Sequence, residues 1–321
     1  MKFNRIAPLF CAAAMLSTVP AIESAAQTVG IGTTKKGATS QVTAAIASIA
    51  SKFGGMQMRP APMAGTQKYI PAVNSGSLEF GAANIMQTAW SIKGQVLSKG
   101  RPNPNIKIVS TLMVFRVGPL VGKKTKFQAV TDLKGARVPT GFKAAPLFNE
   151  LVNTTLATQS MTAADMKSVP ISALVPSWKA LMAGKIDFAI GAYGSGFMKR
   201  IAQKLGGIRF ISLDNSPTVQ ARVSKMLPGA SIKTVKPNPK IPGVEVPTNL
   251  FHFDYMLFAG KHVSNDVVYR VTKAMYENKK ALVAATPMWR SFSPKKMSKD
   301  QGLDFHPGAV KFYKEKGTWN R

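Results

Sequence analysis

The chain has 321 residues, 45% of them hydrophobic, which is enough to build two ordinary hydrophobic cores. Its 43 Lys and Arg residues against 14 Asp and Glu residues give a formal net charge of +29, which predicts an anionic ligand or surface nearby. The basic residues are scattered along the chain and few aromatic residues interleave with them, which argues against a nucleic-acid-binding protein.

Residues 1–26 have the pattern of a cleavable signal peptide. A basic start is followed by the mostly apolar residues 6–22 and by the small residues 24–26, which suit a cleavage site. A retained membrane anchor is the alternative, and Pro8 and Pro20 disfavour it. Cys11, the single cysteine, lies in this segment, so the remaining chain, with a formal charge of +28, has no disulfide, thiolate metal site or cysteine nucleophile. We therefore expect a secreted, periplasmic protein.

Short β-like runs alternate with helical patterns along the rest of the chain. Strands are predicted over residues 28–31, 56–58, 80–84, 106–115, 137–139, 168–170, 187–190, 208–212 and 250–258. Helices are predicted over residues 39–53, 66–74, 146–157, 174–183, 196–205, 215–227 and 265–277. This alternation predicts an α/β fold with a mostly parallel sheet and crossover helices.

The loop after the first strand, residues 30–41, is a candidate ligand site. It carries three glycines and leads into a helix, and Thr39 or Ser40 could cap that helix. Unpaired backbone N–H groups at a helix start favour a carboxylate or a phosphate. The sequence matches neither a Walker loop nor a GxGxxG motif, so an ordinary capped loop with solvated lysines is the alternative.

A short pattern occurs twice. Gly76 and Gly184 each end a predicted helix. In both places the next five positions hold, in order, any residue, an aliphatic residue, an acid, Phe and a small residue. Glycine can end a helix in the left-handed conformation, and the run after it can enter a buried strand. Coincidence is the alternative, but the repeat predicts equivalent units in two similar lobes.

Together with the ending over residues 304–317, these segments resemble the TAXI family of solute receptors for TRAP transporters. The resemblance implies a type II periplasmic-binding-protein fold, with two lobes that each hold a central, mostly parallel sheet flanked by helices. Two crossover strands, near residues 111–118 and 244–255, would join them. Lobe 1 would comprise residues 27–114 with 251–321, and lobe 2 residues 115–250. Independently, the proline-rich stretch 236–247 predicts a non-helical connection.

The resemblance also implies which loops meet in the cleft between the lobes. The ligand-binding residues would be Thr33, Thr34, Lys35, Gly37, Ala38, Thr39 and Asn84 from lobe 1, with Gly141, Phe142, Lys143, Ala144, Ala145, Tyr193, Gly194 and Ser195 from lobe 2. Lys35 and Lys143 could supply cationic contacts. The family usually carries a Gly-Thr-Gly-Gly-like first loop and a Gly-Ser-Gly-Thr-like second one, and this chain departs from both, which leaves the solute open.

The resemblance implies a receptor that closes on a small carboxylate, such as an amino acid or an oxo dicarboxylate, and delivers it to the membrane subunit of a TRAP transporter. We expect a monomer with no cofactor and no nucleic-acid partner. The alternatives are a receptor for an ABC importer and a cationic envelope-interaction protein. An enzyme is disfavoured because the three histidines lie far apart, without an HExxH motif, a nucleophile elbow or a close carboxylate pair.

Overall fold

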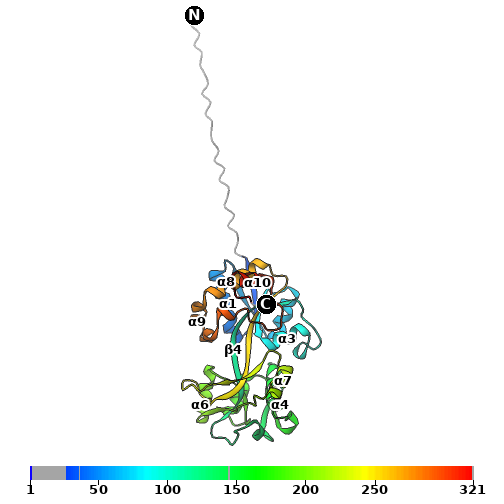
Figure 1. The fold of residues 1–321 in the computed structure, drawn as a ribbon, viewed down its shortest axis with the longest axis vertical. Coiled ribbons are helices and arrows are strands. Elements are labelled where there is room, and N and C mark those ends of the chain that lie inside the picture. The colour runs from blue at the N-terminus through cyan, green and yellow to red at the C-terminus, as the bar shows by residue number, and fades with distance from the viewer. Residues whose placement is uncertain (2–26, 36, 144, 320–321) are drawn as a thin grey trace.

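The computed structural model describes Met1 and residues 27–35, 37–143 and 145–319. Apart from Met1, the predicted signal peptide lies outside the described residues. The described chain forms two lobes, and the long strands β4 (Ile106–Gly122) and β10 (Thr248–Gly260) run from one lobe into the other (Figure 1). Within the described ranges, no helix has the length and apolar character needed to cross a membrane.

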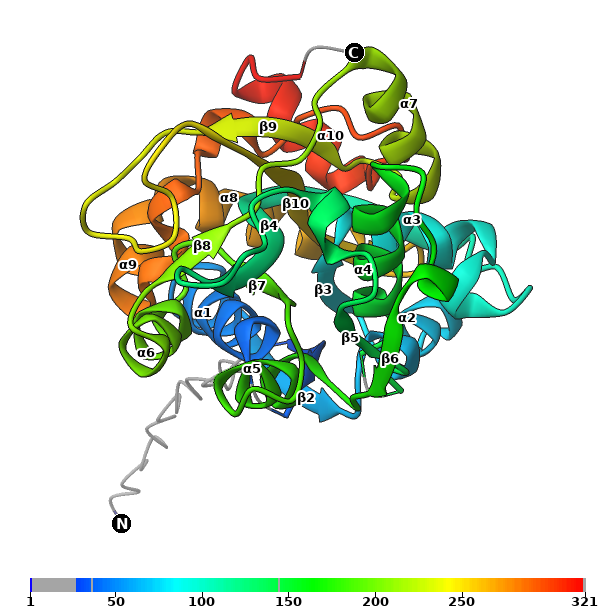
Figure 2. The same cartoon turned by 90° about the horizontal axis from the view of Figure 1, so that it is seen from below.

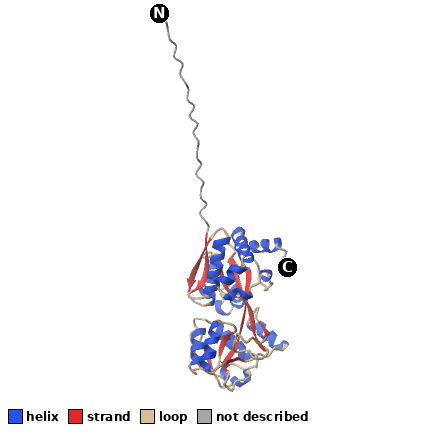
Figure 3. Ribbon diagram, turned by 90° about the vertical axis from the view of Figure 1, so that its left-hand side faces the viewer, coloured by secondary structure: helices blue, strands red, loops and turns tan. Residues whose placement is uncertain are grey.

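Each lobe is built on the same order of three strands and three helices. In lobe 1 these are β1 (Thr28–Thr34), α1 (Ala38–Phe53), β2 (Gln57–Met63), α2 (Thr66–Ser75), β3 (Phe80–Asn84) and α3 (Ile85–Lys93). In lobe 2 they are β5 (Arg137–Thr140), α4 (Leu147–Ala157), β6 (Lys167–Pro170), α5 (Leu174–Met182), β7 (Ala189–Ala192) and α6 (Gly196–Leu205). Helices cover the strands of both lobes (Figure 3).

The other elements extend these two units. Lobe 2 adds β8 (Ile208–Phe210), α7 (Pro217–Met226) and β9 (Ser231–Val235), and lobe 1 adds α8 (Asn265–Glu277), α9 (Lys279–Ala285) and α10 (Pro307–Glu315). Short 3₁₀ helices span Val96–Ser98, Val130–Leu133, Ala163–Asp165, Pro287–Ser291 and Pro294–Lys296. In Figures 1 and 2, α1, α6, α8 and α9 lie on one side of β4, and α3, α4 and α7 lie on the other.

The expected two-lobed α/β fold is confirmed, with a mixed sheet. The strand order is β2-β1-β3-β10-β4-β7, with β8 beside β4 and β9 beside β10, while β5 and β6 form a separate pair. β1 is parallel to β2 and β3, and β5 is parallel to β6. β4 and β10 run antiparallel to each other and to β3, β7, β8 and β9, so parallel strand pairs occur among the described strands only within the repeated units. Ile108 of β4 adds an isolated parallel bridge to Phe305.

The crossover strands are held together along most of their length. Their register runs from Phe251 opposite Val117 to Gly260 opposite Ile106, with irregularities between Asp254 and Met256 and between Leu257 and Phe258. Asp254 is 4% exposed, and its carboxylate accepts hydrogen bonds from the side chains of Lys299 and Gln301. These bonds tie the C-terminal segment to the first of the two irregular points.

The repeated sequence pattern has the same structural role in both lobes. Gly76 ends α2 with φ 89°, and Gly184 follows α5 with φ 66°. The phenylalanines of the two patterns, Phe80 and Phe188, are fully buried. The acid of each pattern accepts a backbone N–H of the adjacent strand, from Gly30 to Glu79 in lobe 1 and from Arg137 to Asp187 in lobe 2.

We expect Asp187→Asn to lower the free energy of unfolding at neutral pH. Asp187 also receives two hydrogen bonds from the Arg137 guanidinium, at 3.2 and 2.6 Å. Burial raises the pKa of Asp187, but the bonds from Arg137 outweigh it and hold the pKa below its usual value. Since the Arg137 side chain is 45% exposed, solvent screening should limit the loss to about 1 kcal/mol.

Urea unfolding of the wild type and the variant at several pH values measures this loss. A carboxylate with a lowered pKa stabilises the fold above its unfolded pKa of about 3.9, and this contribution disappears as pH falls through the folded pKa. The gap between the two proteins should therefore be largest above the unfolded pKa and close as the pH falls through the lowered folded pKa. Glu245→Gln, in an ion pair whose acid is 66% exposed, is the control. Equal losses in the free energy of unfolding of Asp187→Asn and Glu245→Gln would contradict a greater stabilising role for Asp187 than for an exposed ion pair.

Candidate functional site

The candidate loops occupy equivalent places in the two repeats. They follow β1 and β3 in lobe 1, and β5 and β7 in lobe 2. All four lie at the carboxyl ends of strands, where open α/β sheets bind their ligands. The repeat therefore gives each lobe two loops with which to contact a ligand held between the lobes.

Thr33 and Thr34 lie in β1, which extends three residues beyond the predicted strand, so they are not loop residues. The strand continues because its parallel pairing with β2 runs as far as Thr34 opposite Met63. Thr33 is 3% exposed, and its hydroxyl accepts a 2.6 Å hydrogen bond from Thr43 of α1. The Thr33 side chain is therefore engaged inside lobe 1, whereas Lys35 is exposed.

Helix α1 begins differently from the sequence prediction. Its N-cap is Gly37, with φ 99° and ψ −163°, and neither Thr39 nor Ser40 caps it, since both lie in the first helical turn with Ala38. No side chain caps the first turn. The Thr39 hydroxyl instead bonds to the hydroxyl of Tyr255 on β10. Burial raises the pKa of Tyr255 far above its usual value, so this phenol stays neutral.

Asn84 acts as a helix cap. Its side chain accepts the N–H of Gln87 at 2.9 Å and donates to the Gln87 amide oxygen at 2.6 Å. Gln87 in turn donates to Thr66 of α2 at 2.7 Å. Asn84 is only 4% exposed, so this side chain holds α3 in place and is not available to a ligand.

The loop after β5 is a tight glycine turn. Gly141 has φ 73°, and the Lys143 N–H donates to its carbonyl at 2.6 Å. Phe142 is fully buried and packs on Phe148 with ring centroids 5.8 Å apart, so its side chain is engaged inside lobe 2. Lys143 is exposed and Ala145 is half-buried, while Ala144 lies outside the described residues.

The loop after β7 leads into α6 and contacts the crossover strand β4. The Tyr193 N–H donates to the Arg116 carbonyl at 2.9 Å, and the Tyr193 ring packs edge-on against Phe210. Partial burial raises the pKa of Tyr193, and the charge of Arg116 opposes that rise. Gly194 follows with φ 84°. Ser195 is the N-cap residue of α6 by backbone conformation, yet its hydroxyl is buried and has no hydrogen-bond partner among the described residues.

The helices of the repeated units mostly start without a side-chain cap. This holds for α1, α2, α4, α5 and α6, and only α3 has a cap. Outside the repeats, α7, α8 and α10 are capped by Ser216, Ser264 and His306. An uncapped helix start keeps unpaired N–H donors and the positive end of the helix dipole. The candidate loops after β1 and β7 therefore lead into two helix ends suited to an anion. At α4, the N–H groups of Phe148 and Asn149 already donate to the carbonyls of Ala145 and Pro146, so this helix start has fewer donors to offer.

Sequence reasoning missed Phe115 and Tyr255, two aromatic residues of the crossover strands that lie beside these loops. Phe115 of β4 is half-buried and lies 5.3 Å, between ring centroids, from Tyr255. Phe115 also stacks on Phe253 at 6.1 Å. The available signal was the placement of the crossovers, since Phe115 stands at the predicted boundary between the lobes on β4.

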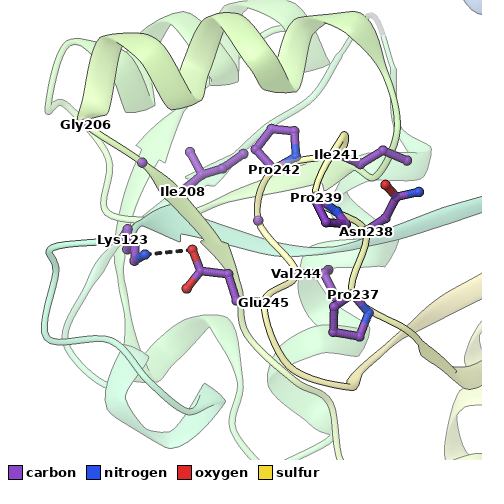
Figure 4. A pocket seen from close by; sticks show the side chains of 12 residues that line it. Lys123, Gly206, Ile208, Pro237, Asn238, Pro239, Ile241, Pro242, Val244 and Glu245 are labelled. Atoms are coloured by element: carbon purple, nitrogen blue, oxygen red, sulfur yellow. Dashed lines mark hydrogen bonds and ion pairs between the residues drawn. The ribbon is translucent and has the colours of Figure 1, made fainter.

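A cavity of about 430 Å³ lies elsewhere, in lobe 2. Its walls are the turn 206–208 and the proline-rich loop 237–245, and Lys123 and Glu245 form a 2.7 Å ion pair at its edge (Figure 4). The loop is non-helical, as predicted. Ile241 of this loop approaches the candidate site, because a Cβ on Gly194 would lie 3.9 Å from its Cδ1.

This architecture is that of the periplasmic binding proteins, and solved structures confirm the fold. The chain is similar to the periplasmic sulfonate-binding protein SsuA of a sulfonate ABC transporter from Methylobacillus flagellatus KT, with 14% identity, TM-score 0.56, and coverage of 92% of this chain and 97% of that one. It is similar to PhnD1 from Prochlorococcus marinus in complex with methylphosphonate, with 9% identity, TM-score 0.57, and coverage of 91% and 99%. MatC from Rhodopseudomonas palustris with bound malate has 12% identity, TM-score 0.56, and coverage of 91% and 96%.

The chain belongs to the NMT1-like family, whose model matches residues 31–317. This match covers nearly all of the residues that the structure describes. It supports the general resemblance to two-lobed binding proteins, but it does not show the more specific relation to TAXI receptors of TRAP transporters.

Gly37→Ala should destabilise the protein. Gly37 has backbone angles that essentially only glycine adopts, and a Cβ there would meet no atom within 4 Å, so the cost is conformational. We expect a loss of about 1–3 kcal/mol in the free energy of unfolding, measured with denaturant. Gly196→Ala is the matched control, because that glycine is helical and equally free of contacts, and its effect should be neutral or favourable. Equal effects would contradict a fixed Gly37 conformation.

Proposed function

We propose that this protein is an extracytoplasmic receptor that captures a small organic anion between its lobes and delivers it to a membrane permease. The observation that carries the proposal is the uncapped start of α1 in one lobe and of α6 in the other, each next to a candidate loop. Backbone N–H groups from both lobes could then bind one anion. The formal charge of +29 supports an anionic solute.

Binding in this proposal makes and breaks no covalent bond. The division into residues 27–114 with 251–321 and residues 115–250 places both lobe boundaries within β4 and β10. Contacts from both lobes are complete only when the lobes close, so the ligand favours the closed state by its difference in affinity for the two states. Moving from mostly open to mostly closed requires about 5.5 kcal/mol, within reach of a few charge-assisted hydrogen bonds.

We propose a permease of the ABC type as the membrane partner. A structural relative with TM-score 0.56 is a sulfonate-binding protein of an ABC transporter, which supports this choice. A TRAP-type permease, which the sequence resemblance implies, is the second candidate. Relatives solved with methylphosphonate and malate support phosphonates, sulfonates and carboxylates as the first solutes to examine.

Thr39→Glu and Lys143→Glu should each weaken anion binding at least about tenfold, because an added carboxylate repels the ligand near a helix start. The measurement is isothermal titration calorimetry with methylphosphonate, methanesulfonate and malate, after a thermal-shift screen of the same anions. A ligand at 100 times its Kd should stabilise the wild type by about 2.7 kcal/mol.

Asn265→Asp is the control, since it adds a negative charge at the first position of α8, outside the candidate site. This variant should bind like the wild type. Full binding in both glutamate variants would mean that these loops do not hold the ligand. No response to any small anion would overturn the receptor proposal itself.

A further inference from the structure

The exposure of the phenylalanines is uneven. Of the 17 phenylalanines, Phe3 and Phe10 lie outside the described residues, and eleven others are buried. The remaining four are Phe53, Phe115, Phe148 and Phe197. Burial of an aromatic ring is strongly favourable, so a ring that remains partly exposed at a candidate site points to an apolar partner.

Three of these four rings lie beside the candidate site. Phe148 and Phe197 are the second residues of α4 and α6, the two lobe 2 helices that begin at candidate loops. Phe115 lies on β4, at the crossover between the lobes. Phe53, the exception, is the last residue of α1, at the opposite end of that helix from the candidate loop.

Each of the three is fixed by a buried aromatic ring. Phe148 packs on Phe142 at 5.8 Å, and Phe197 packs on Trp178 at 4.9 Å. Phe115 stacks on Phe253 at 6.1 Å with an interplanar angle of 6°. Rings held in this way lose little conformational entropy when a ligand covers their exposed part.

We propose that the solute is an organic anion with an aromatic or similarly planar apolar body. This inference rests on the proposed function and adds the substrate class. The anionic group binds at the uncapped helix starts, and the apolar body packs against Phe115, Phe148 and Phe197. The contact between Tyr255 and Thr39 links the two parts of the site, because Tyr255 touches both the start of α1 and the Phe115 ring.

Matched anion pairs test the proposal by calorimetry on the full-length mature protein. The pairs are phenylphosphonate with methylphosphonate, benzenesulfonate with methanesulfonate, and benzoate with acetate. Within a pair the anionic group is constant and only the apolar body changes. For the anionic group that the protein recognises, we expect the aromatic member to bind at least about tenfold tighter, since the larger ring removes more apolar surface from water.

Phe115→Ala, Phe115→Leu and Phe197→Ala should each reduce this ratio severalfold. Phe53→Ala should keep the ratio of the wild type. A ratio compared within one variant is insensitive to a general loss of stability, and Phe115→Leu keeps an apolar side chain at the crossover.

The outcomes separate the two proposals. If the small and aromatic members bind equally to the wild type, or if the variants keep the full ratio, the aromatic class is wrong and the receptor function remains. If no member of any pair binds, both proposals fail. A reduced ratio in the Phe115 and Phe197 variants, but not in Phe53→Ala, supports the inference.

Discussion

The antiparallel ladder between β4 and β10 is the constraint on which the rest of the structure depends. Both strands pass through both lobes, so each lobe completes its sheet with the same two strands. A relative motion of the lobes must bend this ladder, and its register shifts between Asp254 and Met256 and again between Leu257 and Phe258. Tyr255, which lies at the first of these shifts, bonds to Thr39 at the start of α1. One irregular point of the ladder is thus directly connected to a candidate ligand loop.

The duplication of the lobes explains why the site has two similar halves. In each unit a carboxylate from the end of a helix–strand turn holds the backbone of the neighbouring strand. The bond holds β1 at its third residue, Gly30, and β5 at its first residue, Arg137, and so helps to position the loops at the carboxyl ends of both strands. Glycines with positive φ, Gly37 and Gly141, occur in both loops. The scaffold is therefore specified by a few local interactions that occur once in each lobe.

The sequence predicted the alternation of strands and helices, but it did not predict β9, α3, α9 and α10 or all boundaries. The span of β3 and those of several helices follow from apolar periodicity and glycine stops. β2 was predicted too short because Pro60 and Pro62 suggest a break, yet β2 is an edge strand, where missing N–H donors are tolerated. Helix α3 was missed because it follows Asn84 without a connecting loop. Phe142 and Thr33 were assigned to the site because loop position alone does not reveal which side chains a neighbouring helix covers.

The charge of the protein and the chemistry of the candidate site act over different distances. Lys35 and Lys143 are exposed, and water and salt screen such charges within about 10 Å. The many scattered lysines can therefore raise the rate at which an anion arrives, without fixing its position. Fixing the position of the anion requires hydrogen-bond donors that point in a fixed direction. The backbone N–H groups at the start of uncapped helices provide such donors. In the proposed site, the apolar body of the solute adds affinity by packing against the fixed aromatic rings. Neither the lysines nor the backbone N–H groups can distinguish one apolar body from another.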